Sequence, residues 1–596
     1  MRGDIMYTCL KNVQILISLL KQYGIRHVVI SAGTRHTPLV HSVEQDSFFK
    51  TYSVVDERSA SFFAIGMIDQ LREPVAVCCT SGSAAANYVS AANEAFYQEL
   101  PLLLLTADRN HYYQFQQEEQ MIPQEGLYAA VCKKVVTLNH VRDEKDAWYC
   151  ARLCNEALME LFDGKRGPVH INFVVENDYP VHQGIVRFNA ETLPAVRKTG
   201  RLTLESSPEE WQRWAERLRR SRVLIIYGQR GPVSEREAAL IDAFCERYSC
   251  VVMTDLLSNL HCRHSLHSFP MARMMNAEEL KALAPDILIT MNAFSISEMK
   301  YKLGSPHFFG EHWHVSPDGQ ISDPFKCLPD TIACSPMTFF EKFTALAEPK
   351  APNAYFEAWR AQYTRIGKQG SLNDEPVAYS SMYGIQQLIR RIPDGALLHI
   401  GNSNSIRLAN YFQPSEKVTV FGNRGSHGID GSMSAFVGQA HIRGKLSFLI
   451  LGDLSFFYDM NALWNQYVGK NLRILLCNNS GGGIFHSYPN QKNVPTLDEH
   501  IAAEHHTSAE AWVRARGFTY LSCRNKAEFD SALPQLLAEE TDAPVILEMF
   551  TDKEADAESI RTLNSTYLRA LPPTLKQRVG SMLPEDVKDT IKKFLH

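Results

Sequence analysis

The 596-residue sequence lacks any apolar run that approaches the roughly 20 residues of a membrane-spanning helix. Its first residues also lack the pattern of a secretory signal. Thirteen cysteines are present, but no two of them have the C-x-x-C spacing of a redox or zinc motif. We therefore expect a cytoplasmic protein with no membrane partner, in which the cysteines are reduced.

The sequence also lacks an excess of positive charge. It has 61 Lys and Arg against 66 Asp and Glu, a net charge of -5, which argues against a nucleic-acid partner. No repeat of 20–50 residues or low-complexity tract is evident. With 45% hydrophobic and 21% charged residues, the composition is that of an ordinary globular protein. The length predicts about three or four domains.

Two polar clusters in the C-terminal half each follow a short apolar run. Residues 452–455 (Gly-Asp-Leu-Ser) follow the run 446–451, and residues 478–483 (Asn-Asn-Ser-Gly-Gly-Gly) follow the run 473–477. Between them, apolar residues at helical spacing predict a helix over 460–468. This order predicts two neighbouring parallel strands with both clusters at their carboxyl ends, where open α/β sheets bind ligands.

The residue types in these clusters suit a magnesium diphosphate. The carboxylate of Asp453, the amide oxygen of Asn479 and a backbone carbonyl near Gly481 are hard oxygen donors. Glycine-rich backbone amides can approach a diphosphate closely. Each cluster alone is also an ordinary turn. Together, Gly-Asp and an Asn pair on either side of the short span 454–477 match the thiamine diphosphate signature.

Strands and helices alternate in the N-terminal part as well. Strands are predicted at 28–30, 51–55, 75–79 and 102–105, with helices at 12–23 and 59–70, and a polar turn follows each strand. This pattern predicts a doubly wound parallel sheet. Glu57, in one of these turns, is either a helix first-turn acid or the glutamate that a thiamine diphosphate enzyme needs at the pyrimidine ring.

Several segments resemble one family. Residues 31–39, 56–60, 80–84 and 106–109 resemble the pyrimidine-binding domain of the 2-succinyl-5-enolpyruvyl-6-hydroxy-3-cyclohexene-1-carboxylate (SEPHCHC) synthases of menaquinone biosynthesis, within the thiamine diphosphate-dependent superfamily. Residues 422–431 resemble the family's Asn-Arg-Gly and Gly-Ile-Asp-Gly segment. The resemblance covers most of residues 10–550.

The resemblance implies an α/β protein with three doubly wound parallel-sheet domains and a helical C-terminal tail. The expected boundaries are a pyrimidine-binding domain at 1–190, a central Rossmann-like domain at 191–370, a diphosphate-binding domain at 371–555 and the tail at 556–596. Polar stretches near 185–208 and 349–376 are expected to be linkers.

The resemblance to this family also implies the reaction, the cofactors and the oligomeric state. A carboligase of this family uses thiamine diphosphate and Mg²⁺, with Mn²⁺ as an alternative, to decarboxylate 2-oxoglutarate and to add the succinyl carbanion equivalent to isochorismate. Such an enzyme is a homodimer or homotetramer whose active sites lie at the subunit interface.

The site residues carried over from the family fall into four groups. Glu57 has the catalytic role at the pyrimidine ring. The expected cofactor-binding residues are Glu57, Gly82, Gly401, Asn402, Ile429, Gly452, Leu454 and Ser455. The expected metal ligands are Asp453, Asn479 and Gly481. For substrates, Ser403 and Arg407 match the donor contacts, Thr34, Arg35, Arg109 and Gln120 the acceptor contacts, and Arg424 the mouth of the site.

Two departures from the family pattern concern the acceptor. Thr34 replaces a Ser, and Glu298-Met299 stand where basic residues are expected, with Lys300 and Lys302 as the nearest substitutes. An acid at position 298 would repel a dicarboxylate. A related carboligase or decarboxylase with another acceptor is therefore an alternative. A silent paralogue that acts as a binding subunit is a further alternative, against which the intact Glu57, Asp453 and Asn479 argue.

Overall fold

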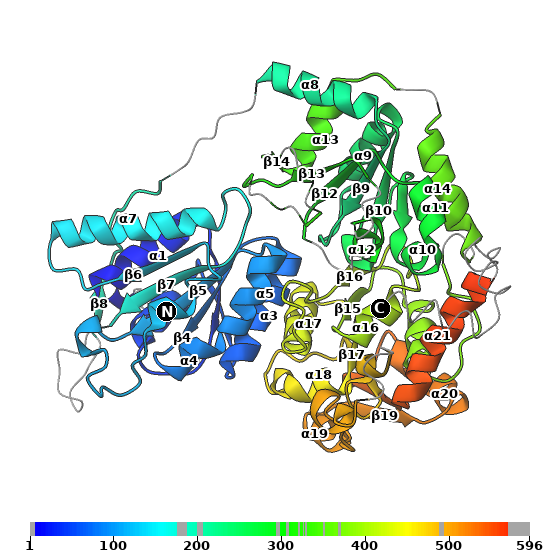
Figure 1. Cartoon of the computed structure of the whole chain (residues 1–596). Coiled ribbons are helices and arrows are strands. Elements are labelled where there is room, and N and C mark those ends of the chain that lie inside the picture. Colours follow the sequence, from blue (N-terminus) through cyan, green and yellow to red (C-terminus); the bar gives the residue numbers. More distant parts are fainter. Residues whose placement is uncertain are drawn as a thin grey trace.

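The computed structural model describes residues 6–175, 187–199, 207–293, 298–304, 309–319, 322, 324–325, 327, 331–349, 352–367, 371–487 and 494–569. In this part of the chain, helices cover the faces of three six-stranded sheets (Figure 1). Every strand pairing within these three sheets is parallel. The predicted α/β class with doubly wound parallel sheets is confirmed.

The first sheet has the order β3-β2-β4-β5-β7-β6. Its strands are β2 (His27–Ile30), β3 (Lys50–Ser53), β4 (Val75–Cys79), β5 (Leu102–Asp108), β6 (Lys134–Leu138) and β7 (Val169–Val174). Its helices are α1 (Lys11–Tyr23), α2 (Thr37–Gln45), α3 (Glu57–Leu71), α4 (Ser83–Asn87), α5 (Val89–Gln98), α6 (Gln124–Leu127) and α7 (Glu144–Glu160). Because β4 and β5 are buried along their whole length, they are nearly continuous apolar runs.

The last sheet repeats this topology in the order β16-β15-β17-β18-β20-β19. Its strands are β15 (Leu397–Ile400), β16 (Thr419–Phe421), β17 (Ser447–Gly452), β18 (Leu472–Asn478), β19 (Thr519–Cys523) and β20 (Val545–Phe550). Its helices are α15 (Ser381–Ile389), α16 (Asn404–Ala409), α17 (Ser432–Arg443), α18 (Asp453–Tyr458), α19 (Glu510–Ala515), α20 (Lys526–Leu537) and α21 (Lys553–Arg569). The strand order reverses between β15 and β17, which is where such sheets bind ligands.

The central sheet has the Rossmann order, β11-β10-β9-β12-β13-β14. Its strands are β9 (Val223–Tyr227), β10 (Cys250–Thr254), β11 (Ser265–His267), β12 (Ile287–Met291), β13 (Glu311–Val315) and β14 (Thr331–Ile332). Its helices are α8 (Pro208–Arg219), α9 (Glu235–Arg247), α10 (Ser268–Met274), α11 (Ala277–Ala282), α12 (Glu298–Gly304), α13 (Pro336–Ala345) and α14 (Ala354–Arg365). A capping box between Ser207 and Glu210 starts α8 at Pro208.

Helices α3 and α17 join the first and last sheets (Figure 1). A Cβ atom added at Gly66 would overlap the carbonyl oxygen of Ala435, and one added at Gly438 would overlap that of Phe63. The two backbones therefore touch, and Gln439 Nε2 donates across the contact to Asp69 Oδ2 at 2.8 Å. This packing fixes the start of α3, where Glu57 lies, and the segment before α17, which carries Ile429.

The prediction of a helix over 460–468 is wrong. The helix after β17 is α18, which begins at Asp453, and only η3 (Met460–Leu463) forms a 3₁₀ turn. After this turn, the side chain of Asn465 bonds to the backbone in place of helical backbone hydrogen bonds. Its Nδ2 donates to the carbonyl of Ala462 at 2.6 Å, and its Oδ1 accepts from the amide of Tyr467 at 2.8 Å. Such local bonds compete with a helix.

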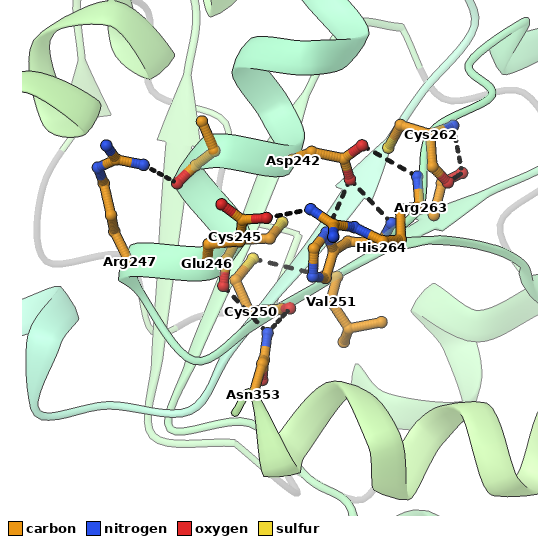
Figure 2. A network of polar contacts seen from close by, with 12 residues as sticks. Asp242, Cys245, Glu246, Arg247, Cys250, Val251, Cys262, Arg263, His264 and Asn353 are labelled. Carbon is orange, nitrogen blue, oxygen red and sulfur yellow. Dashed lines mark hydrogen bonds and ion pairs between the residues drawn. The ribbon is translucent and has the colours of Figure 1, made fainter. Parts of the chain in front are cut away.

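The polar stretch 349–376 is not a plain linker, because α14 lies within it. Figure 2 shows how Asn353 fastens this helix to the central sheet: Nδ2 donates to the carbonyls of Cys245 and Cys250 at 3.0 and 2.7 Å. Its Oδ1 caps α14 by accepting from the amide of Phe356 at 3.0 Å.

The other predicted linker and the tail also contain regular structure. In the linker expected at 185–208, β8 (Phe188–Ala190) pairs antiparallel with β1 (Tyr7–Thr8). In the tail expected at 556–596, α21 extends to Arg569, and residues 570–596 lie outside the described part. In the described residues, no helix is both long and apolar enough to cross a membrane.

Candidate active site

A cavity of about 350 Å³ opens at the carboxyl edge of the last sheet, where the strand order reverses. Residues after β15, β17 and β18 meet there. Nine of the residues predicted from the sequence line it: Asn402, Ser403, Ile429, Gly452, Asp453, Leu454, Ser455, Asn479 and Gly481. We call this space the main cavity.

The predicted cation ligands lie together in the main cavity. The buried carboxylate of Asp453 accepts the amide of Gly481 on Oδ2 at 2.9 Å, and His505 Nε2 lies 3.3 Å from the same oxygen. Asn479 donates its Nδ2 to Asp556 Oδ2 at 2.8 Å, which leaves its Oδ1 for a cation. Among the described residues, no group of three or more His, Cys, Asp or Glu could hold a metal ion. One carboxylate with neutral oxygens suits a hard cation that also binds phosphate and water.

The glycines of the main cavity leave room for a diphosphate. A Cβ atom added at Gly452 would meet nothing within 4 Å, so the space beside this strand end is open. Gly481 has φ +140°, and a Cβ atom there would lie 2.6 Å from the carbonyl oxygen of Ala502. Position 481 therefore requires glycine, and the residues present fit the expected cofactor.

Asn402 connects the end of β15 with the loop that carries Ile429. Its Nδ2 donates to the carbonyls of Asn423 and Gly428, each at 2.5 Å, and its Oδ1 accepts from Arg424 Nη1 at 2.9 Å. Ser455 Oγ holds the other side of the loop by donating to the carbonyl of Ile429 at 2.6 Å. Ile429 is thus fixed from two strand ends at the wall of the main cavity. Gly401, which precedes Asn402, is not among the residues that line it.

Two predicted substrate-binding arginines lie near one another beside this loop. Burial, and then the nearby Arg407, lower the pKa of Arg424 to about 10. Arg407 Nη1 donates to the carbonyl of Ser403 at 2.9 Å, and Ser403 has the unusual φ of +65°. Two guanidinium groups held close despite their repulsion favour an anion between them. Strain at Ser403 is typical of a functional position.

The other predicted substrate contacts gather at the corresponding edge of the first sheet. Thr34 and Arg35 follow β2, Gly82 follows β4 and Arg109 follows β5. The amide of Arg35 donates to Thr80 Oγ1 at 3.4 Å, and a Cβ atom added at Gly82 would lie 3.2 Å from the carbonyl oxygen of Gln120. Arg109 forms an ion pair with Glu118, and burial together with Arg109 lowers the pKa of Arg35. This second group is also cationic.

Glu57 is half-buried at the start of α3. Burial raises the pKa of its carboxyl group, and the neighbouring Asp56 raises it further. Asp56 caps the helix by accepting the amide of Ser59 at 2.8 Å, and it also accepts from Asn461 Nδ2 at 3.0 Å. The described residues that line the main cavity all lie between positions 381 and 503, so Glu57 is not among them.

Asp556 is the main residue that sequence reasoning missed. It lies fully buried in the first turn of α21, where it accepts the amide and Oγ of Ser381 at 2.6 and 2.7 Å in addition to Asn479. Burial raises the pKa of its carboxyl group. The sequence carries no signal for it, because it stands in a charged stretch typical of a solvent-exposed helix. Described residues that line the main cavity and were also missed are Ser381, Ile385, Asn404, Ser405, Leu408, Cys477, Gly482, Gly483, Phe485, Ile501 and Ala503.

Comparisons with known proteins show which family the chain belongs to. Residues 10–127 match the model of a family described as "Thiamine pyrophosphate enzyme, N-terminal TPP binding domain". The chain is 38% identical over 565 residues to the 2-succinyl-5-enolpyruvyl-6-hydroxy-3-cyclohexene-1-carboxylate synthase of Phocaeicola vulgatus, with 93% of this chain and 98% of the relative covered. It is 37% identical over 576 residues to that of Bacteroides fragilis, covering 93% and 99%. It is 31% identical over 568 residues to that of Porphyromonas gingivalis, covering 93% and 97%.

Proposed function

Because the chain belongs to the SEPHCHC synthase family of thiamine diphosphate-dependent transferases, we propose that it decarboxylates 2-oxoglutarate and adds the succinyl unit to isochorismate in menaquinone biosynthesis. We propose Mg²⁺ as the metal, with Mn²⁺ as a substitute. The observation that carries this proposal is the main cavity, where Asp453, Asn479 and Gly481 meet beside the open space at Gly452.

Each part of the main cavity has a proposed task. Asp453, Asn479 and the carbonyl of Gly481 hold the metal, which binds the diphosphate. Bound thiamine diphosphate supplies the chemistry by accepting the electron pair that is left when carbon dioxide departs. Ile429, fixed by Asn402 and Ser455, supports the bent shape of the cofactor.

We propose that the site is completed by a second copy of the chain, in a homodimer or homotetramer. Support comes from the position of Glu57. Its neighbours Asp56 and Arg58 bind Asn461 and the carbonyl of Tyr458, at the C-terminal end of α18, whereas Asp453 begins this helix. Large apolar side chains are exposed in the same region, at Val55, Tyr458 and Trp464. A second copy that covered them would bring its own Glu57 to the pyrimidine ring, where this carboxyl group exchanges a proton with the ring.

The two cationic groups then serve the two substrates. Ser403, Arg407 and Arg424 bind the carboxylates of 2-oxoglutarate. Thr34, Arg35, Arg109 and Gln120 of the other copy bind the acceptor. Guanidinium groups suit both tasks because they bind carboxylates through two parallel hydrogen bonds.

Carbon dioxide release tests this function. Purified protein with thiamine diphosphate and Mg²⁺ is given 2-oxoglutarate, with and without isochorismate, and products are identified by mass. We expect a succinylated isochorismate adduct. Decarboxylation without an adduct would indicate a different acceptor, and no decarboxylation would overturn the donor assignment.

Glu57→Gln tests the proton transfer separately. The variant keeps the size and a hydrogen-bonding side chain but loses the acid, so we expect turnover to fall by about 10²–10⁴-fold. Thiamine diphosphate should still bind with an affinity within a few-fold of the wild type, measured by titration calorimetry. Turnover that survived the substitution would show that Glu57 has another role.

A further inference from the structure

A second cavity of about 350 Å³ adjoins the main cavity, and the two share Asn404 and Leu408 as wall residues. We call it the side cavity. Its walls come from three distant parts of the chain: α10 and α12 of the central domain, α16 with the segment at 484–487, and the C-terminal helix α21. The described residues that line it are Phe269, Arg273, Glu298, Asn404, Arg407, Leu408, Tyr411, Ile484, Ser487, Ala557, Ile560, Arg561 and Asn564.

The charges in this lining favour an anion. Among the described lining residues, three are arginines, at positions 273, 407 and 561, and one is an acid, Glu298, so these residues carry two positive charges more than negative ones. Arg407 is already the proposed ligand for a substrate carboxylate. Arg273 and Arg561 add cationic groups to the same space, although no family motif pointed to either of them.

Arg273 pairs with the acid that departs from the family pattern. Its Nη1 lies 3.4 Å from Glu298 Oε1. Arg273 also lies next to Tyr411. The ring of Tyr411 makes an edge-to-face contact with Phe269 at 5.1 Å, and its hydroxyl donates a hydrogen bond to Asn564 Oδ1 at 2.9 Å. Glu298 is therefore offset by a central-domain cation, and its repulsion of a dicarboxylate is reduced.

Arg561 reaches the side cavity from α21. Glu558 and Glu554 of the same helix hold its guanidinium group at 2.9 and 3.8 Å. The helix is anchored on both sides of this position, by Asp556 to Asn479 and by Asn564 to Tyr411. The C-terminal helix thus forms a fixed wall beside the proposed substrate site.

We propose that the side cavity binds a carboxylate of a substrate, with Arg273 and Arg561 as ligands beside Arg407. This inference rests on the proposed function. It makes α21 part of the substrate site, and it moves the basic contribution of the central domain from position 298 to position 273. The carboxylate belongs either to the far end of 2-oxoglutarate or to the acceptor, and the experiment separates the two.

Direct binding tests the side cavity without turnover. Glutarate carries two carboxylates but lacks the keto group that reacts, and butyrate lacks the second carboxylate. Both are titrated into the protein loaded with thiamine diphosphate and Mg²⁺. We expect Arg273→Gln and Arg561→Gln each to weaken glutarate binding by about tenfold, the usual effect of losing one charge-assisted bond, and to leave butyrate unchanged. Arg273→Lys should restore part of the loss.

The matched control is Arg263→Gln. Arg263 is a central-domain arginine that pairs with Glu246 in the network of Figure 2, away from either cavity lining. The Arg263→Gln variant should bind glutarate with the affinity of the wild type. Unchanged glutarate binding in both Arg273→Gln and Arg561→Gln, together with unchanged KM values for both substrates, would overturn the inference.

Steady-state kinetics identify the source of the carboxylate. If the donor occupies the side cavity, both variants raise the KM for 2-oxoglutarate and lose selectivity over 2-oxopentanoate, which lacks the far carboxylate. If the acceptor does, they raise the KM for the acceptor alone. Wild-type protein that bound glutarate but released no carbon dioxide from 2-oxoglutarate would refute the proposed function. If the wild type turned over and both variants had its kinetic constants and its glutarate affinity, only the proposed role of the side cavity would be refuted.

Discussion

Asn479 donates its Nδ2 to the carboxylate of Asp556 at 2.8 Å, and this bond joins a proposed metal ligand to the C-terminal helix. Asp556 also accepts the amide and hydroxyl of Ser381 and the hydroxyl of Thr551, so its position is fixed by four donors. With Nδ2 engaged, the Oδ1 of Asn479 is oriented for a cation. Residues that orient metal ligands in this way commonly affect affinity by about 10–100-fold.

Asp556→Asn should therefore weaken metal-dependent cofactor binding. Its new amide group competes with Nδ2 of Asn479, so we expect at least tenfold weaker binding of thiamine diphosphate at limiting Mg²⁺. Calorimetric titration at several Mg²⁺ concentrations measures this, with the exposed Asp542→Asn as the control. Equal affinity in Asp556→Asn and wild type would show that the bond does not orient the ligand.

Mixing two inactive variants tests whether a site combines two copies of the chain. Glu57→Gln removes the proposed proton-transfer residue and Asp453→Asn removes the proposed metal-binding carboxylate. If each site takes Glu57 from one copy and Asp453 from the other, a mixed dimer has one intact site. We expect refolded mixtures to recover up to about a quarter of the wild-type activity, since half of the dimers are mixed and each has one of two sites. A mixture as inactive as its parents, with mixed dimers shown by mass spectrometry, would place both residues in the same copy.

Substitutions at two glycines should have different effects, one on cofactor binding and the other on the stability of the fold. Gly452→Ala adds a methyl group in open space beside the main cavity, so we expect weaker thiamine diphosphate binding and an unchanged unfolding temperature without cofactor. Gly66→Ala places a methyl group against Ala435 in the α3–α17 contact and should lower the free energy of unfolding by about 1–3 kcal/mol.

Gly126→Ala is the control for both, because a Cβ atom there would meet nothing within 4 Å and Gly126 does not line the main cavity. Thermal unfolding of the cofactor-free proteins and calorimetric titration give the two readouts. Loss of stability in Gly452→Ala, or none in Gly66→Ala, would contradict the packing described for these positions.

The strands of this fold were predictable because their burial on both faces makes them apolar runs. Residues 75–79 form a strand with the predicted bounds. Four wall residues of the main cavity, Gly452, Asp453, Asn479 and Gly481, were predictable for a related reason: in a parallel sheet, chain segments that follow neighbouring strands must meet at one edge. The position of a short motif relative to the sheet therefore follows from its position at the end of a strand. The other five predicted wall residues came from the family resemblance.

The rest depended on contacts between segments far apart in the chain. Arg273 and Arg561 line one cavity because α10 and α21 contact each other, and no local pattern encodes that arrangement. Asp556 was missed because its sequence neighbours are charged, so the segment is typical of an exposed helix although Asp556 itself is buried. Helix α14 was missed because the polar stretch around it resembles a linker, while the side chain of Asn353 supplies both its cap and its attachment.

His399 should make the stability of the protein sensitive to mild acid. It lies fully buried in β15, where its Nδ1 bonds to Gln439 Oε1 at 2.9 Å, and its Nε2 has no hydrogen-bond partner among the described residues. Burial lowers its pKa from 6.5 to about 4. In the unfolded chain the imidazole takes up a proton below about pH 6.5, whereas in the folded protein it stays neutral down to about pH 4, so acidification through this window favours unfolding.

The size of this effect follows from linkage: between pH 7.5 and 5.0, His399 should remove about 2 kcal/mol from the free energy of unfolding. His399→Gln keeps a polar side chain but does not titrate, so its urea unfolding free energy should fall less over the same interval, by about that amount. His500→Gln, at an exposed position, serves as the control and should retain the wild-type dependence. If the curves for wild type and His399→Gln ran parallel from pH 7.5 to 5.0, the acid sensitivity would have to arise from other buried groups.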